Sequence, residues 1–178
     1  DKALASADWY GFEERRKASA EKGLLRGLGV ATYLEATGAP AREMGRLRFE
    51  EDGTVTIVTG SLDYGQGHAA PFAQVVGSTL GIPIERFSLI QGDSDELIAG
   101  QGTGGSKTMI SGGTIMLHTA EKVIENGRQI AAHVLEASPV DIEFDAGRFT
   151  VVGTDKSISI LELVEEARQG LPADVPQS

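Results

Sequence analysis

Two turn signals and the order of the segments around them constrain the fold more than any other feature of the sequence. Asp52-Gly53 interrupts the apolar alternation of residues 43–60, and Ala146-Gly147 interrupts that of residues 140–153. Both predict β-hairpins, because glycine tolerates the positive φ of a tight turn. Hairpins make consecutive strands antiparallel. The sequence therefore predicts an α+β fold, with antiparallel β-hairpins packed with helices, rather than a doubly wound parallel sheet.

Helical patterns separate these hairpins. The predicted helices are residues 8–22, 69–80, 108–136 and 160–169. The third is one long helix with an apolar stripe, although Gly127 weakens it. The last begins with the capping box Ser159-x-x-Glu162, which satisfies the first free N–H groups of a helix.

Two further segments are predicted as strands, residues 26–37 and residues 86–91. The first alternates in strand fashion, with one set of positions formed by Leu28, Val30, Thr32 and Leu34. A chain of 178 residues has the size of one domain. We expect a single domain over residues 1–178, with a frayed tail at 171–178.

Composition excludes several classes of function. The net charge is −10, and this argues against a nucleic-acid partner, which needs clustered Lys and Arg. Cysteine is absent, so the chain has no disulfide, thiolate metal site or Cys nucleophile. Its histidines, His68, His118 and His133, show no metal-ligand spacing. No metal ligand is therefore expected within this chain.

Nothing in the sequence indicates a membrane protein. No apolar run approaches the roughly 18–20 residues that a membrane span needs. The start of the chain lacks the basic and apolar regions of a signal peptide. We therefore expect a cytoplasmic protein, and the absence of an initial Met suggests an excised segment.

A glycine-rich loop before a helix occurs twice in the sequence, and this repeated pattern indicates a ligand-binding site. Twice an extended segment runs into a glycine-rich loop that opens a helix, first at Gly65-Gln66-Gly67-His68 and then from Gly102 to Ser106, which leads into Lys107-Thr108. The first N–H groups of a helix lack intrahelical acceptors, and the helix dipole adds positive potential there. Such loops suit an anion or a polar heterocycle.

Plainer explanations compete with a ligand at each loop. Gly65 and Gly67, taken alone, are equally typical of a turn. His68 is more typical of a residue that caps or packs a turn than of a ligand, since it has no partner at ligand spacing. A P-loop ending in Lys107-Thr108 is excluded. It would need glycine at positions 101 and 106, where the chain has Gln101 and Ser106.

The order and spacing of several motifs resemble those of the molybdenum hydroxylase large subunits, the family of xanthine dehydrogenase, aldehyde oxidase and carbon monoxide dehydrogenase. The resemblance covers about residues 8–170, and the carbon monoxide dehydrogenase-like branch is the most similar. The motifs that carry it are Phe12-Glu13-Glu14-Arg15-Arg16, Arg26-Gly27-Leu28-Gly29-Val30-Ala31, Gly65-Gln66-Gly67-His68, Phe72-Ala73-Gln74, Leu80-Gly81-Ile82-Pro83, Gln91-Gly92-Asp93-Ser94 and Gly102-Thr103-Gly104-Gly105-Ser106-Lys107-Thr108.

The resemblance implies roles for the residues of both loops. It places Gln66 near the oxo group of molybdenum, in the second shell of the metal. The other cofactor-binding positions are Gly65, Gly67, His68, Gly104, Gly105, Ser106, Lys107 and Thr108. Those of the second loop would line the pterin phosphate, or the pyrophosphate of a cytosine dinucleotide form.

Two departures from the family pattern weaken particular contacts. Ala70 and Pro71 stand where the family often has a hydroxyl and a small or polar residue. Lys107 replaces a frequent Arg, which keeps the charge but loses the planar fork.

In the intact enzyme, the resemblance implies hydroxylation of an aldehyde, an N-heterocycle or a CO-like substrate with water. Electrons would leave through iron–sulfur and FAD partners, and the large subunit would form a dimer. The substrate loop and the catalytic Glu of the family are expected outside residues 1–178, so the chain alone should be inactive. Two alternatives stay open: a stand-alone nucleotide- or anion-binding module that uses the same loops, and an interaction domain without ligand. The second of these predicts that the two loops lie far apart.

Overall fold

The computed structural model describes residues 2–34, 38, 42–172 and 175. Internal contacts divide the chain into two units, Asp1–Glu35 and Ala36–Ser178. Most of the expected frayed tail lies outside the described residues. In the described part of the chain, no helix is both long and apolar enough to cross a membrane.

The first unit is a short helical segment followed by an extended run. It contains α1 (Lys2–Ser6), a 3₁₀ turn (Trp9–Gly11) and α2 (Phe12–Ala20), so the helix expected over residues 8–22 is confirmed in its central part. The Arg15 guanidinium joins α2 to the preceding turn by bonds to the Asp8 carboxylate and to the carbonyls of Ala7 and Asp8.

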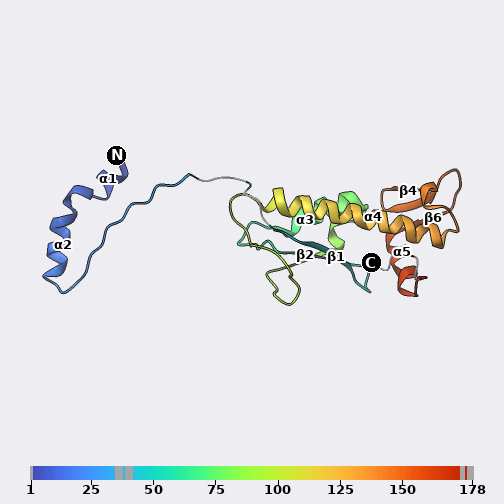
Figure 1. Cartoon of the computed structure of the whole chain (residues 1–178), viewed down its shortest axis with the longest axis horizontal. Coiled ribbons are helices and arrows are strands. Elements are labelled where there is room, and N and C mark those ends of the chain that lie inside the picture. The colour runs from blue at the N-terminus through green and yellow to red at the C-terminus, as the bar shows by residue number, and fades with distance from the viewer. Residues whose placement is uncertain (1, 35–37, 39–41, 173–174, 176–178) are drawn as a thin grey trace. The chain divides into compact units, whose positions relative to one another are not determined.

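The predicted strand over residues 26–37 is wrong for the residues that can be checked. Residues 24–34 leave α2 as an extended run without regular structure (Figure 1), and residues 35–37 lie outside the described residues. The physical reason is the lack of a partner, since a strand forms only where another strand takes up its backbone N–H and C=O groups.

The second unit contains the first predicted hairpin. β1 (Gly45–Phe49) and β2 (Val55–Thr59) pair antiparallel, with Gly45 opposite Thr59 and Phe49 opposite Val55. Asp52 stabilises the turn, because its Oδ1 accepts hydrogen bonds from the Thr54 N–H at 2.9 Å and the Thr54 hydroxyl at 2.6 Å.

A parallel strand pair, which the sequence did not predict, completes this sheet. α3 (Ala69–Leu80) leads to β3 (Phe87–Gln91), and β3 pairs parallel to β2. A strand that follows a crossover helix can return in the same direction as the first, whereas a hairpin cannot. The fold class is still α+β, since every other strand pair is antiparallel in the described part of the chain.

The second hairpin is also confirmed. β4 (Ile142–Asp145) and β5 (Arg148–Val151) pair antiparallel through Ala146 and Gly147, whose φ angles are 44° and 83°. β6 (Ser157–Ser159), which the sequence did not predict, extends this second sheet. It leads into α5 (Ile160–Arg168), which begins with the expected capping box.

One long helix packs against both sheets and contributes to a shared core. A π-helical turn (Thr108–Gly113) continues into α4 (Thr114–Val134), which runs from the first sheet to the second (Figure 1). Fully buried side chains of this core include Val55, Phe72, Val76, Leu80, Met116 and Phe149. Both sheets are therefore packed against α4.

Candidate functional site

The two glycine-rich loops lie side by side at the carboxyl end of the parallel strand pair. β2 ends at Thr59 and runs into the first loop, and the second loop returns to the same place, where the Gly102 N–H donates to the Gly60 carbonyl at 3.1 Å. The backbones approach so closely that a Cβ on Gly60 would lie 2.4 Å from the Gly100 Cα. Ligands commonly bind at this edge of parallel strands.

Side chains add to this contact between the loops. The Leu62 N–H donates to the Thr103 hydroxyl at 3.2 Å, and Thr103 Oγ1 lies 3.1 Å from Thr108 Oγ1. The interaction-domain alternative predicted two distant loops, and the structure contradicts that prediction.

Asp63 organises the first loop, and sequence reasoning missed it. Its Oδ1 accepts from the N–H groups of Gly65 and Gln66 at 2.7 Å and of Gly67 at 3.2 Å, and its Oδ2 accepts from the His68 N–H at 2.7 Å. These bonds, that from His68 foremost, lower the pKa of Asp63 from 3.8 to about 2. The signal was available, because an aspartate shortly before a helix is a common cap.

The backbone of the first loop is therefore already bonded to an anion of the chain itself. The sequence predicts that these N–H groups are free for a ligand, as at an uncapped helix start. The structure instead directs them to the Asp63 carboxylate. What the first loop offers a ligand is mainly the Gln66 side chain.

Gln66 is exposed between two glycines with positive φ, Gly65 at 107° and Gly67 at 74°. Its Oε1 accepts from the Tyr64 N–H, which fixes the orientation of the amide. Its amide NH₂ group donates to no acceptor among the described residues. Gln66 therefore presents an oriented pair of exposed N–H donors.

His68 lies beneath the first loop rather than within reach of a ligand. Its side chain is 5% exposed and packs on Phe72, with ring centroids 5.7 Å apart. Its Nδ1 lies 3.3 Å from Nε2 of Gln91, which also donates to Ser61. In the described part of the chain, no cluster of His, Asp and Glu could hold a metal ion. His68 thus supports the loop from below.

The second loop has the opposite electrostatic character. Positive φ angles at Gly102, Gly105 and Ser106 turn the backbone ahead of the π-helical start of the long helix. The N–H groups of Gly104, Gly105 and Ser106 donate to no acceptor in the described part of the chain, although the Gly105 carbonyl accepts from Gly38 at 2.8 Å. Unsatisfied donors at a helix start attract an anion.

Space for a ligand adjoins these donors. No atom of the described residues lies within 4 Å of a Cβ built on Gly104, Gly65 or Gly67. A groove of about 430 Å³ also opens next to the loops, lined by Gly60, Leu62, Gly92, Ser94, Leu97, Ile98, Ala99, Gly100 and Gly102. Its size is that of a small-molecule site.

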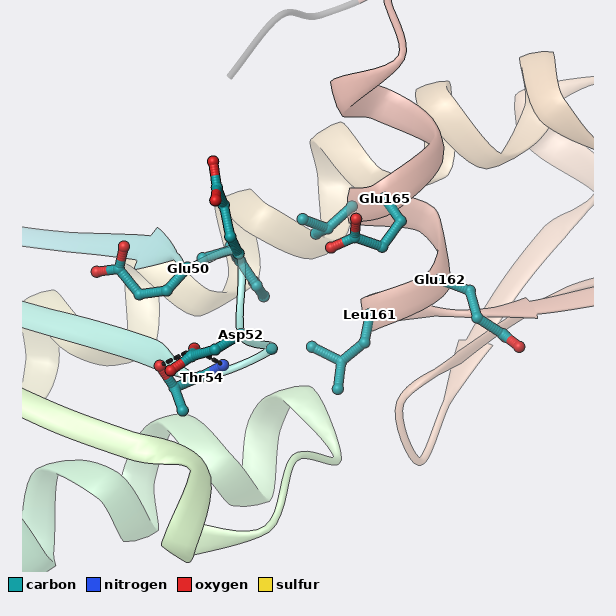
Figure 2. Close-up of a pocket in the computed structure, with 10 residues that line it drawn as sticks. Glu50, Asp52, Thr54, Leu161, Glu162 and Glu165 are labelled. Carbon is teal, nitrogen blue, oxygen red and sulfur yellow. Dashed lines mark hydrogen bonds between the residues drawn. The ribbon is translucent and has the colours of Figure 1, made fainter.

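A second pocket, at the other end of β2, has a structural explanation. It lies between the β1–β2 turn and α5, and its labelled carboxylates include Glu50, Asp52 and Glu165 (Figure 2). Asp52 bonds Thr54, Glu50 pairs with Arg48, and Glu165 pairs with Arg168. Each of these carboxylates already has a partner, so the candidate site is at the glycine loops.

The site is thus a pair of adjacent loops, one with N–H donors that have no acceptor in the described part of the chain and the other with an oriented amide, and this arrangement suits a polar, anionic cofactor. Comparison with known proteins agrees. The profile of the family described as "Molybdopterin cofactor-binding domain" matches residues 2–176, and the chain belongs to this family.

Named relatives come from multi-subunit oxidoreductases. The gamma subunit of the 6-hydroxypseudooxynicotine dehydrogenase complex of Paenarthrobacter nicotinovorans is 31% identical over 92% of this chain and 20% of its own length. The carbon monoxide dehydrogenase large chain of Hydrogenophaga pseudoflava is 29% identical over 86% of this chain and 20% of its own. This chain therefore spans about a fifth of these relatives.

A solved structure shares the fold. The reconstituted CO dehydrogenase from Oligotropha carboxidovorans superposes with a TM-score of 0.73 and 27% identity, over 97% of this chain and 24% of that one. The resemblance to molybdenum hydroxylase large subunits is thereby confirmed. The stand-alone nucleotide-binding alternative finds no support.

Proposed function

We propose that this chain forms one wall of the molybdopterin site in the large subunit of a molybdenum-dependent hydroxylase. The observation that carries the proposal is the set of N–H groups at Gly104, Gly105 and Ser106 that have no acceptor among the described residues, together with the exposed, oriented amide of Gln66 in the loop that contacts theirs. The residues fit such a cofactor, because they combine anion-binding donors, a glycine backbone open to close approach and an oriented amide.

Each loop has its own task in this proposal. Gly104, Gly105 and Ser106 bind a phosphate oxygen through the backbone, and Lys107 and Thr108 add a charge and a hydroxyl. Gln66 donates from its amide to the oxo group of molybdenum. Gly65 and Gly67 give the loop the conformation that presents this amide, and His68 holds the loop from beneath.

The intact enzyme adds what this chain lacks. The cofactor supplies the redox chemistry by which a carbon centre is hydroxylated with water. We propose an aldehyde, an N-heterocycle or a CO-like molecule as substrate, a cytosine dinucleotide form of the cofactor, iron–sulfur and FAD partners, a large-subunit dimer and a cytoplasmic location. The printed names "subunit gamma" and "large chain" of the relatives support assembly with partner subunits.

A substitution at Gly104 tests the anion site in the full-length subunit. The Cβ position of Gly104 is in open space, and its φ is not in the left-handed region, so Gly104→Val should leave the thermal stability of the cofactor-free subunit nearly unchanged. The added side chain would occupy the space of the phosphate. We expect a several-fold lower content of molybdenum and pterin per purified subunit, measured by metal analysis and pterin fluorescence.

Full molybdenum and pterin content in a folded Gly104→Val subunit would contradict the proposal. Native mass spectrometry separates the alternatives further. A pterin mass on the wild-type subunit supports the proposal, whereas ATP or simple phosphate at the same site would overturn it.

A further inference from the structure

We propose that residues 25–34 form a β-strand that is added to a sheet edge in the part of the large subunit outside these 178 residues. This inference concerns an interaction surface and does not depend on how the loops bind the cofactor. It requires only that the chain is part of a longer subunit.

The first observation is the exposure of large apolar side chains along this segment. Leu25 is 103% exposed, Leu34 97%, Tyr33 85% and Val30 69%. The charged residue of the segment, Arg26, is anchored locally, because its Nε donates to Ser19 Oγ at 2.9 Å. A contiguous apolar run of this length on the surface marks an interaction site.

The second observation is the alternation of side-chain size. Over residues 27–31, Leu28 and Val30 occupy one set of alternate positions, while Gly27, Gly29 and Ala31 occupy the other, which Leu25 and Tyr33 extend with large side chains at its two ends. Alternate positions of a strand face opposite sides, so the centre of the strand would have one bulky and one small face. Apolar residues on both faces are typical of a strand enclosed between two layers.

The glycines give a third argument. Gly27 and Gly29 do not have positive φ angles, and no atom lies within 4 Å of a Cβ built on either. Neither backbone conformation nor packing within the described residues therefore requires glycine here. A strand glycine without such a local cause suits the close approach of another chain segment.

The backbone decides between an apolar pocket and a strand edge as the partner. Among the described residues, no backbone bond is formed by residues 25–34, while the Leu24 N–H donates to Ser19. Burying the apolar side chains would also bury the backbone N–H and C=O groups, which then need partners. A strand edge satisfies both demands at once.

The length of the relatives indicates where that edge lies. This chain spans 20% of the relatives named above and 24% of the solved CO dehydrogenase chain. In subunits of that length, most residues lie outside the part that matches residues 1–178. The occupant that we propose is an exposed strand edge in that remainder.

Hydrogen exchange on the intact large subunit tests the proposal. We expect the amides of residues 26–34 to exchange about as slowly as those of β2. Exchange at the rate of an unstructured peptide would overturn the proposal. Protection that disappears when the protein is diluted to monomers would also overturn it, because the partner would then be a second copy.

A pair of matched variants gives an independent readout. Val30 and Val152 are both exposed in this structure, at 69% and 52%. In the intact subunit we expect Val30→Asp to lower the melting temperature by several degrees or to prevent folding, and Val152→Asp to leave it nearly unchanged. Equal, small effects of the two variants, together with rapid exchange over residues 26–34, would overturn the proposal.

Discussion

Asp63 explains how a small glycine loop keeps one conformation. Its carboxylate gathers the N–H groups of four successive residues, from Gly65 to His68. Hydrogen bonds of this kind to an ionised acceptor are stronger than neutral ones. The exposed amide of Gln66 is thereby held by bonds on both sides of it, to Asp63 through the backbone and to Tyr64 through Oε1.

The pH dependence of stability should reveal this bond network. The pKa of Asp63 is 3.8 without these bonds and about 2 with them, so its contribution is complete above pH 3.8 and is lost as the pH falls toward 2. We expect Asp63→Asn to lower the melting temperature by several degrees at neutral pH, and this difference should shrink through that acidic window.

Thermal unfolding of both proteins across the pH range provides the measurement. Asp155→Asn serves as the control, because Asp155 is exposed and forms no hydrogen bond through its carboxylate in the described part of the chain. A wild-type–Asp63→Asn difference that stays constant down to pH 2 would refute the role of the carboxylate.

Gln66 itself should matter for activity and little for stability. Its side chain is exposed, and its one bond within the described residues is that from the Tyr64 N–H. A hydrogen bond to a charged or strongly polar group contributes roughly 1.5–3 kcal/mol, so Gln66→Ala in the intact enzyme should lower kcat/KM about 10- to 100-fold.

The matched control is Gln74→Ala, an exposed glutamine on the outer side of α3. Both variants should melt close to the wild-type temperature. If Gln66→Ala melts many degrees lower while activity per folded molecule persists, Gln66 has a structural role instead.

At the scale of elements, Gly127 shows how α4 accommodates the second sheet. A Cβ at this position would lie 2.4 Å from Cζ of the fully buried Phe149. By helix propensity alone this glycine weakens the helix, whereas in the structure it leaves room for the Phe149 ring. The gap in the helix surface is what lets β5 approach.

Gly127→Ala should therefore destabilise the protein although alanine is the better helix former. Overpacking costs about 1–3 kcal/mol, against a propensity gain of about 1 kcal/mol, so we expect a net loss of up to about 2 kcal/mol. Denaturant unfolding measures it, with the exposed Glu121→Ala on the same helix as control. A more stable Gly127→Ala protein would show that β5 can move away at little cost.

Local chemistry determined which elements the sequence could predict. The turns at Asp52-Gly53 and Ala146-Gly147 and the capping box at Ser159 act within a few residues, and all three were confirmed. The parallel pairing of β2 with β3 and the added strand β6 depend on contacts between distant segments. Periodicity records which side chains a segment can bury but not which segment it meets.

At the scale of the whole molecule, the 178-residue chain by itself should not turn over substrate. The substrate loop and catalytic Glu of the family are expected elsewhere in the subunit, and this chain spans about a fifth of its relatives. The purified chain should show no hydroxylation of aldehyde or purine with an electron-acceptor dye. The intact complex is the positive control, and turnover by the chain alone would contradict the prediction.

The position of the two loops next to each other could not be predicted from the sequence, because it depends on contacts across the whole molecule. The residues of both loops were named from their glycines and from the family resemblance. Their adjacency, however, rests on the contact of Gly60 with Gly100 and on the bond between Leu62 and Thr103. Such contacts join residues that are 40 or more positions apart, as with Leu62 and Thr103. The opposite charge preference of the loops depends on Asp63 and was not foreseen.

Because of this difference, the two sides of the site have opposite electrostatic character. One loop carries a negative charge, that of Asp63, shortly before its helix, and its neighbour carries N–H donors without an acceptor in the described residues, just before the long helix. A ligand with one anionic end and one uncharged end meets repulsion in one orientation and attraction in the other. We therefore expect the charge of Asp63 to favour one orientation of such a ligand in the site.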